Sequence, residues 1–127
     1  MTKYNPMTSE ELLAVIDTVT EHLLKQNARS KDPAIAQCLY RGPNGLKCAV
    51  GILISDAAYK SNINLLPVYS ESVQDALEES GYPVRDDYNL LKLLSDLQDL
   101  HDRKEVANWP SELNKLKYRW QCRLALE

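Results

Sequence analysis

The chain contains few of the residues and patterns that mark membrane, secreted or disulfide-rich proteins. It has no phenylalanine, four glycines and three cysteines among 127 residues. No run of about 18 consecutive apolar residues occurs, so we expect no membrane-spanning helix. The opening residues, MTKYNPM, lack the apolar run of a secretory signal peptide. An odd number of cysteines without such a leader is typical of free thiols in a reducing cytoplasm, where we expect the protein to be located.

The charge balance argues against two further classes of protein. Fifteen Lys and Arg residues stand against eighteen Asp and Glu residues, which gives a formal net charge of -3. This value argues against a dedicated DNA-binding protein, and it is too small for a protein that mimics DNA. The length suits a single domain spanning residues 1–127, which can bury a core without metals or disulfide bonds.

Capping signals predict the first two long helices. Thr8 with Glu11 three residues later forms a capping box, and apolar residues then recur at helical spacing as far as about Gln26. A second helix is expected to begin after Ser70. It ends at Gly81, which is typical of a left-handed C-cap.

Two more helices are predicted in the C-terminal half. The helix that follows Asp86 or Asp87 carries six leucines between residues 90 and 100, so we expect it at the centre of the fold. Four residues after Leu97, His101 is expected on the core-facing side of this helix. The last helix begins near Trp109, because the following proline is tolerated in a first turn.

The stretch from Gln37 to Ile54, QCLYRGPNGLKCAVGILI, predicts a β-hairpin. The residues Gly42-Pro43-Asn44-Gly45 suit a type I turn in which Gly45 takes the left-handed fourth position and produces a bulged hairpin. A tighter two-residue turn at Asn44-Gly45 is the alternative. The two registers differ by one residue, and this exchanges the two faces of the hairpin.

We favour the bulged register because it keeps the charged side chains of Arg41 and Lys47 together on one face. Farther from the turn it predicts three more pairs: Tyr40 with Cys48, Leu39 with Ala49 and Cys38 with Val50. The opposite face is then apolar and can be buried: Cys38, Tyr40, Leu46, Cys48 and Val50.

The residues after the hairpin predict a bend at Gly51 and a short helix from Ser55 to Tyr59, followed by a loop over residues 60–69. Another loop is expected over residues 27–36. The fold class predicted from these elements is α+β, mainly α, with four to five helices and one β-hairpin packed on them.

The side-by-side cations Arg41 and Lys47 are the first candidate binding site. Like charges on one exposed face repel each other, and an anion would offset that repulsion. With Tyr40 and Lys60 nearby, the pair predicts a site for a small anion or a nucleotide, against the plain interpretation of a solvated hairpin tip. The turn lacks the GxxxxGK[ST] pattern of a phosphate-binding loop.

Thiol and metal chemistry has weaker support. No CxxC or HxxxH pair occurs among the potential ligands, so we expect no metal and no cofactor. These ligands are Cys38, Cys48, Cys122, His22 and His101. A thiol enzyme would need an activated cysteine beside a histidine, for which Cys48 and His101 are the candidates. Because Cys48 faces inward in the favoured register, we favour a protein that is not an enzyme.

A row of cations at Lys115, Arg119 and Arg123 is a second candidate surface. Together with Tyr118 and Trp120 it resembles a surface that binds nucleic acid. Residues 68–102, however, carry nine acidic and two basic residues, and the acidic helix after Ser70 competes for these cations. We therefore expect charge pairing within the chain or solvation, and no nucleic-acid partner.

The motif CxYRGxxGLKCAVG, at residues Cys38 to Gly51, resembles a family of small uncharacterised proteins from tailed phages and prophages. The likeness continues through a Leu-Ile-x-Asp-x-x-Tyr segment at Leu53 to Tyr59, with Ser55 where the family pattern has proline. It extends to Leu97-Gln98, His101-Asp102 and Trp109, and thus covers about two-thirds of the chain. The resemblance implies a bacterial host, in which such accessory proteins often bind and modulate a host protein, including defence systems. Our leading prediction is such a binding protein.

Overall fold

The computed structural model describes residues 6–32, 34 and 37–126 of the chain. Within this part the fold is mainly α, as predicted, and consists of four α-helices and several short 3-10 turns. The helices are α1 Ser9–Gln26, α2 Glu71–Glu79, α3 Tyr88–Arg103 and α4 Trp109–Ala125. None of the described helices is long and apolar enough to cross a membrane. The first five residues, and the predicted loop at Pro33, Ile35 and Ala36, lie outside the described residues.

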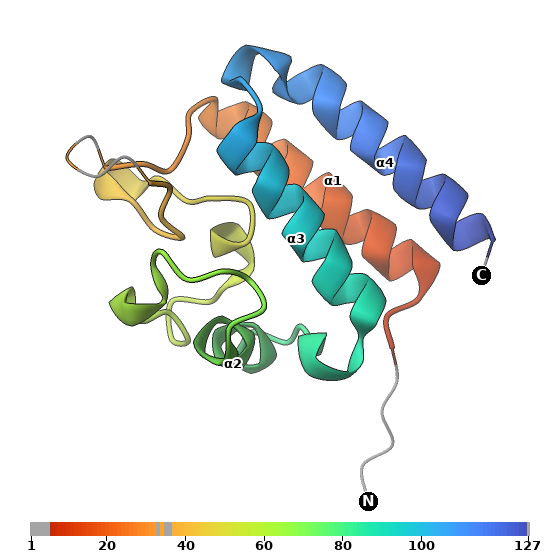
Figure 1. Cartoon of the computed structure of the whole chain (residues 1–127), viewed down its shortest axis with the longest axis horizontal. Coiled ribbons are helices and arrows are strands. Elements are labelled where there is room, and N and C mark those ends of the chain that lie inside the picture. The colour runs from red at the N-terminus through yellow and green to blue at the C-terminus, as the bar shows by residue number, and fades with distance from the viewer. Residues whose placement is uncertain (1–5, 33, 35–36, 127) are drawn as a thin grey trace, which may run out of the picture.

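Three of the helices form one layer. In Figure 1, α1, α3 and α4 lie side by side, while α2 and the irregular segment that precedes it occupy the other side of the molecule. Helix α1 contacts both α3 and α4, and α3 also contacts α4. The leucines of α3 explain its central position, because they point both to α1 and to the irregular segment.

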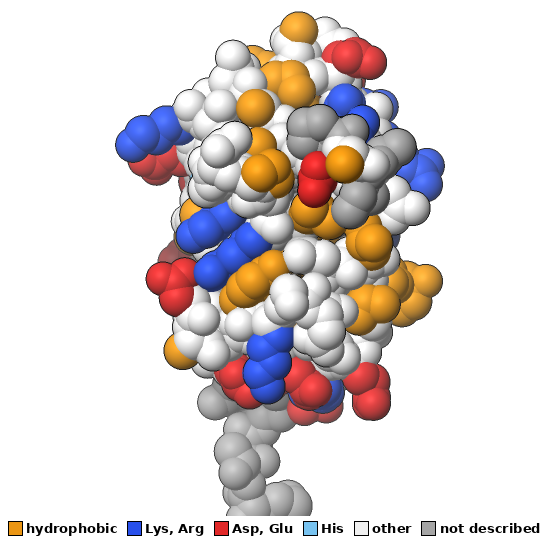
Figure 2. All heavy atoms as spheres, turned by 90° about the vertical axis from the view of Figure 1, so that its left-hand side faces the viewer, with side chains coloured by type: hydrophobic (Ala, Val, Ile, Leu, Met, Phe, Trp, Pro, Cys, Tyr) orange, Lys and Arg blue, Asp and Glu red, His pale blue; other side chains and the backbone are white. Residues whose placement is uncertain are grey.

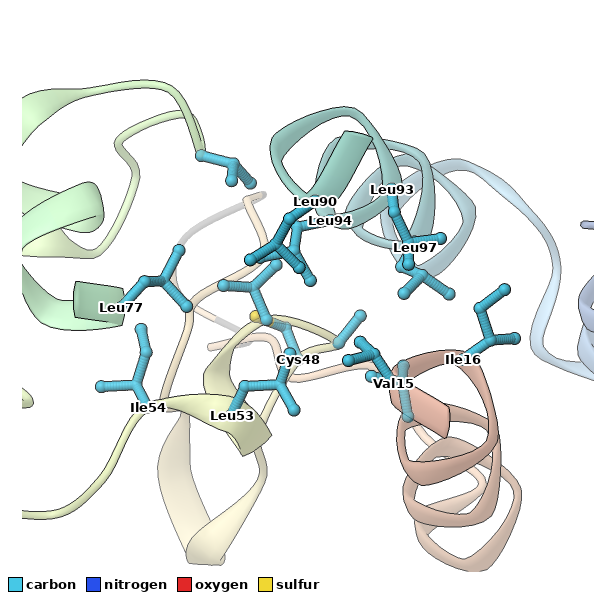
Figure 3. Close-up of a cluster of buried hydrophobic side chains, with 14 of the residues drawn as sticks. Val15, Ile16, Cys48, Leu53, Ile54, Leu77, Leu90, Leu93, Leu94 and Leu97 are labelled. Atoms are coloured by element: carbon cyan, nitrogen blue, oxygen red, sulfur yellow. The ribbon is translucent and has the colours of Figure 1, made fainter. Parts of the chain in front are cut away.

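The core joins this layer to the irregular half. Figure 3 shows Leu94 and Leu97 of α3 beside Val15 of α1, with Cys48 and Leu53 of the irregular segment reaching the same cluster. Most of these side chains are fully buried or nearly so. Burial of apolar surface of this extent is the main stabilising term for a domain of this size.

The predicted helix ends are confirmed. The Thr8 hydroxyl accepts the Glu11 N–H at 3.1 Å, and the Glu11 carboxylate accepts the Thr8 N–H at 2.9 Å, which completes the capping box. After the C-terminal end of α2, Gly81 adopts a left-handed φ of 96°. The Tyr82 N–H donates to the Leu77 carbonyl at 2.9 Å, the bond expected of a Schellman cap. Asp87, not Asp86, caps α3.

The predicted β-hairpin is wrong in extent but correct in register at its tip. Among the described residues there is no strand, and only two isolated antiparallel bridges occur, one of which joins Arg41 to Lys47 as the bulged register requires. The turn itself follows the alternative, because Asn44 and Gly45 both have positive φ, 58° and 76°, as in a type I′ turn.

Pro43 explains why the bulged register and the two-residue turn are both partly correct. The Leu46 N–H donates to the Pro43 carbonyl at 3.2 Å, which closes the two-residue turn. Because Pro43 has no N–H to return this bond, the Gly42 N–H donates to the Leu46 carbonyl instead, at 2.9 Å. The arm before the turn thus has one extra residue opposite Leu46, as in a β-bulge. This bulge places Arg41 opposite Lys47.

The next predicted pair is also formed, since the Cys48 N–H donates to the Tyr40 carbonyl at 3.2 Å, but the pairs beyond it are not. Cys38 bridges to Lys31 instead of Val50, and the Leu39 N–H donates to the Ser30 carbonyl at 2.8 Å. The arm after the turn bends away from the first arm at Gly51, where an added Cβ would lie 2.0 Å from the Tyr40 carbonyl oxygen.

After this close approach the chain forms a 3-10 helix, Gly51–Leu53. The predicted short helix from Ser55 to Tyr59 is a single turn, in which the Ser55 carbonyl accepts the N–H groups of Ala58 and Tyr59.

Candidate functional site

A cleft of about 560 Å³ separates helix α3 from the irregular half of the molecule. One wall is a row of polar side chains at helical spacing on α3. The other wall is the segment 65–69 together with Gln37, Cys38 and Tyr40. The lining residues are Gln37, Cys38, Tyr40, Leu65, Leu66, Pro67, Val68, Tyr69, Ser95, Gln98, Asp99 and Asp102. Figure 2 shows that hydrophobic side chains reach the surface of the irregular half in several places.

The segment 65–69 begins with a residue in an unusual backbone conformation. Leu65 has a φ of 74°, a value that costs free energy for any residue with a side chain. The Tyr40 hydroxyl donates to the Leu66 carbonyl at 2.6 Å and fixes the segment to the hairpin. Burial raises the pKa of Tyr40, so its phenol stays protonated and serves as the donor. At the rim, Leu65 remains 50% exposed and Tyr69 69% exposed.

Beside the cleft, His101 is fully buried and has both ring nitrogens occupied. The Ser30 N–H donates to Nε2 at 3.1 Å, so Nε2 must carry a lone pair. The proton of the neutral ring is then on Nδ1, which donates to Asp102 Oδ1 at 2.7 Å. The ring of Trp109 stacks on the imidazole with 5.5 Å between ring centres. This histidine therefore positions the chain at Ser30, and both of its ring nitrogens already have a partner.

Cys38, His101 and Asp102 bring three potential metal ligands within 4.8 Å of one another. A histidine that binds a metal normally donates its other N–H to a carbonyl or carboxylate. In this site the nitrogen available to a metal carries the proton, and the other nitrogen faces an N–H donor. The hydrogen bonding thus opposes a transition metal. His22, another candidate ligand, bonds the Lys47 carbonyl through Nε2 at 2.9 Å.

Cys38 and Cys48 are poor nucleophiles in this environment. Cys38, which was not the predicted thiol, lies beside His101. Burial, together with the charge and hydrogen bond of Asp102, raises the pKa of Cys38 to about 11. Burial raises the pKa of the fully enclosed Cys48 to about 12. Both thiols are protonated at neutral pH, so the geometry does not favour a thiol enzyme. Cys122 is exposed on α4.

The predicted anion site loses its main cation to contacts within the chain. The Arg41 guanidinium forms an ion pair with Asp56 at 2.8 Å and donates to the Ile54 carbonyl at 3.0 Å. It also lies 4.5 Å from the centre of the Tyr59 ring, and its side chain is only 19% exposed. The expectation of an exposed Arg41 is therefore wrong, because Asp56 of the same chain supplies the anion.

The other predicted members of that site are not gathered around Arg41. The Tyr40 hydroxyl points to Leu66, as described above, and Lys60 borders a separate cavity of about 280 Å³ that also contains Asp75 and Glu78. Within the described part of the chain, no ion pair involves Lys47. We therefore do not propose a small anion or a nucleotide as the ligand.

The second predicted surface is partly neutralised on its own helix. Lys115 lies 3.8 Å from Glu112, and Arg119 lines a cavity that also contains Glu112. Arg123 lies over the Trp120 ring at 4.9 Å and donates to Asn89 at 3.3 Å.

Helix α2 is not the acidic partner of this row. Its Asp75 forms an ion pair with Arg85, and α4 instead uses Lys117 to pair with Asp17 of α1 at 2.7 Å. Pairing within the chain is found for Lys115, with Glu112 of its own helix, and the predicted partner α2 is wrong.

Sequence reasoning missed most of the cleft. It singled out neither Asp99 nor the rim residues Leu65, Leu66 and Tyr69. The polar row on α3 was visible as i, i+3 and i+4 spacing opposite the leucines. The segment that faces this row was not visible, because its position depends on the bond between Tyr40 and Leu66.

Residues of the phage-like motif contact one another. Gln98 accepts the Val50 N–H at 3.1 Å, His101 stacks on Trp109, and Asp56 pairs with Arg41. No protein-family model, curated protein or solved structure matches the chain. The resemblance to small phage proteins stays a prediction.

Proposed function

We propose that this chain is a small phage-related accessory protein that acts without catalysis, by binding and modulating a host protein such as a component of a defence system. It does so in the cytoplasm of the bacterial host. The observation that carries this proposal is the cleft between α3 and segment 65–69, whose rim exposes Leu65 and Tyr69.

The chemistry around the cleft supports binding over catalysis. His101 has no free ring nitrogen, and the thiol of Cys38 is held protonated. Exposed aromatic and aliphatic side chains at a concave rim are typical of surfaces that bind other proteins. A strained backbone, as at Leu65, often occurs at ligand sites, where surrounding contacts hold it in place.

Affinity capture tests the proposal. The tagged chain is incubated with bacterial lysate, and the captured proteins are identified by mass spectrometry. We expect one specific host protein, and we expect its recovery to fall when Leu65→Asn and Tyr69→Ser remove the apolar rim. Asparagine suits position 65 because it tolerates a positive φ.

A matched control is Tyr118→Ser, which removes an equally exposed tyrosine from α4. This variant should capture the host protein as well as the unmodified chain does. Thermal melts establish that all variants are folded. A chain that captures no specific protein under several salt conditions, or a rim variant that captures as much as the unmodified chain, would contradict the proposal.

A further inference from the structure

The charged lining of the cleft has one sign. Asp99 and Asp102 are the only charged residues among those described that line it, and no Lys, Arg or His contributes. An anionic ligand would be repelled by this lining. A cationic ligand would be attracted, and complementary charge of this kind determines which partners are accepted.

Asp102 is held ready to accept a donor. Its Oδ1 accepts from His101 Nδ1 at 2.7 Å and from Gln98 Nε2 at 2.9 Å, so the carboxylate is fixed in orientation. The Cys38 thiol is a further hydrogen-bond partner of Asp102, and the carboxylate side chain remains 38% exposed. Apart from the neutral ring of His101, it has no basic partner in this part of the chain. A fixed, partly exposed carboxylate binds an ammonium or guanidinium group well.

Asp99, one turn earlier, has a replaceable partner. Its ion pair with Arg103 is long, 3.9 Å, and both side chains are largely exposed, 70% and 80%. Exposed pairs within one helix are weak. An incoming cation can therefore displace Arg103 without breaking a buried contact.

The apolar side of the cleft suits the rest of a basic residue. Leu65, Leu66 and Pro67 stand across from the two acids, where they can contact the methylene groups of a Lys or Arg side chain. The exposed ring of Tyr69 can stack on a guanidinium group or on an aromatic neighbour. The volume of about 560 Å³ accommodates a few side chains, and not a folded domain.

We propose that the cleft receives a short extended protein segment in which Lys or Arg alternates with apolar residues, the basic side chains reaching Asp99 and Asp102. This inference rests on the proposed function, because the segment belongs to the partner protein. It adds the chemistry that the partner must present.

A titration followed by NMR tests the inference on the full chain labelled with ¹⁵N. The probes are the synthetic peptide acetyl-Leu-Lys-Trp-Lys-Leu-amide and its acidic counterpart, in which both lysines are replaced by glutamate. We expect the basic peptide to shift the amide signals of residues 65–69 and 98–102. It should bind on the order of tenfold more tightly than the acidic peptide, or better.

Variants and a third probe sharpen the result. Asp99→Asn should weaken binding of the basic peptide several-fold, and Asp99→Lys should abolish the preference for it. Asp17→Asn, which removes an exposed acid from α1, should change nothing. Equal affinity for the two peptides, no binding of the basic peptide, or shifts located elsewhere would overturn the inference. Spermidine shifts as large as those of the peptide, at equal concentration, would assign the cleft to a free polyamine and overturn it too.

The capture experiment separates this inference from the function on which it rests. If the rim variants lose a host protein but the two peptides bind equally, the binding function stands and the basic segment is wrong. If the basic peptide binds in the cleft but no host protein is captured, the chemistry of the cleft stands and the proposed function fails.

Discussion

The three-helix layer and the irregular half of the molecule are held by different interactions. The layer of α1, α3 and α4 is stabilised by buried leucines, valines and tryptophans that pack at helical spacing. The irregular half, residues 37–70, contributes side chains to the same core, and side chains of the helices also bond its backbone at Lys47 and Val50. Helix side chains thus occupy positions that neighbouring strands would occupy in a sheet, and this explains why the predicted hairpin does not extend.

Gln26 at the end of α1 is the clearest example of a helix side chain in the place of a neighbouring strand. Its amide nitrogen donates to the Lys47 carbonyl at 2.9 Å, and its amide oxygen accepts the Lys47 N–H at 3.0 Å. This pair of bonds resembles the exchange between two residues of adjacent strands. Gln98 accepts the Val50 N–H in the same way, with one bond, and His101 accepts the N–H of Ser30, just before this half. Shape in this half therefore depends on a few polar side chains.

The largest effect on the layer is expected from Trp109→Ala. The indole is completely buried, stacks on His101 and donates to the Lys104 carbonyl at 3.2 Å. Removing it leaves a large cavity, so we expect the free energy of unfolding to fall by about 3–5 kcal/mol. Urea denaturation followed by circular dichroism measures this change. The exposed Tyr118→Ala is the control and should stay within about 0.5 kcal/mol; a small effect of Trp109→Ala would show that the layer does not depend on this contact.

A smaller but local effect is expected from Gly51→Ala in the irregular half. The new methyl group would collide with the Tyr40 carbonyl, so the tip must move, at a cost of about 1–3 kcal/mol. Gly45→Ala has open space around it but a φ of 76°, and should cost only about 1 kcal/mol. Chemical denaturation of both variants gives the comparison. If Gly45→Ala were the more damaging change, backbone conformation at the turn would matter more than the close approach.

The two regions also differ in how far the sequence predicts them. Capping of α1 by Thr8 and Glu11, and the cap at Gly81, depend on residues three to five positions apart, so a local pattern reveals them. Arg41 with Asp56, Gln26 with Lys47 and Tyr40 with Leu66 join residues that only the tertiary fold brings together. No periodicity in the sequence indicates these partners. The same polar side chains would also be compatible with exposure to solvent.

The cleft was not predictable for the same reason. Its α3 wall follows from helical spacing, but its other wall depends on the positive φ of Leu65 and on the hydrogen bond from Tyr40. Leucine is an uncommon residue at such a φ, so its identity gives no signal for this conformation.

A pH titration probes the boundary between the two regions at His22. Burial lowers the pKa of His22, which bonds the Lys47 carbonyl. The unfolded chain then binds a proton more readily than the folded chain does. Stability is complete above the unfolded value, about 6.5, and is lost as the pH falls through the lower folded pKa. Denaturation at several pH values should show this loss, and His22→Gln should flatten that part of the profile; an unchanged profile would contradict the role of His22.

The smallest effect is expected at the surface of the layer. Lys117 and Asp17 form a 2.7 Å ion pair between α4 and α1, but both side chains are well exposed. We expect Lys117→Gln to change the free energy of unfolding by about 0–1 kcal/mol, and less at high salt. Denaturation at low and high salt concentration measures this. A larger loss would mean that charge, and not apolar packing, holds α4 to the layer.

Hydrogen exchange at the Val50 amide tests most directly whether helix side chains hold the irregular half. This N–H donates to Gln98, and Gln98→Ala removes its acceptor. We predict that the free energy of opening at Val50 falls by about 1–3 kcal/mol. The amide of Leu116 in α4 should change by no more than about 0.5 kcal/mol. Equal losses at both amides, or an unchanged Val50, would contradict the account.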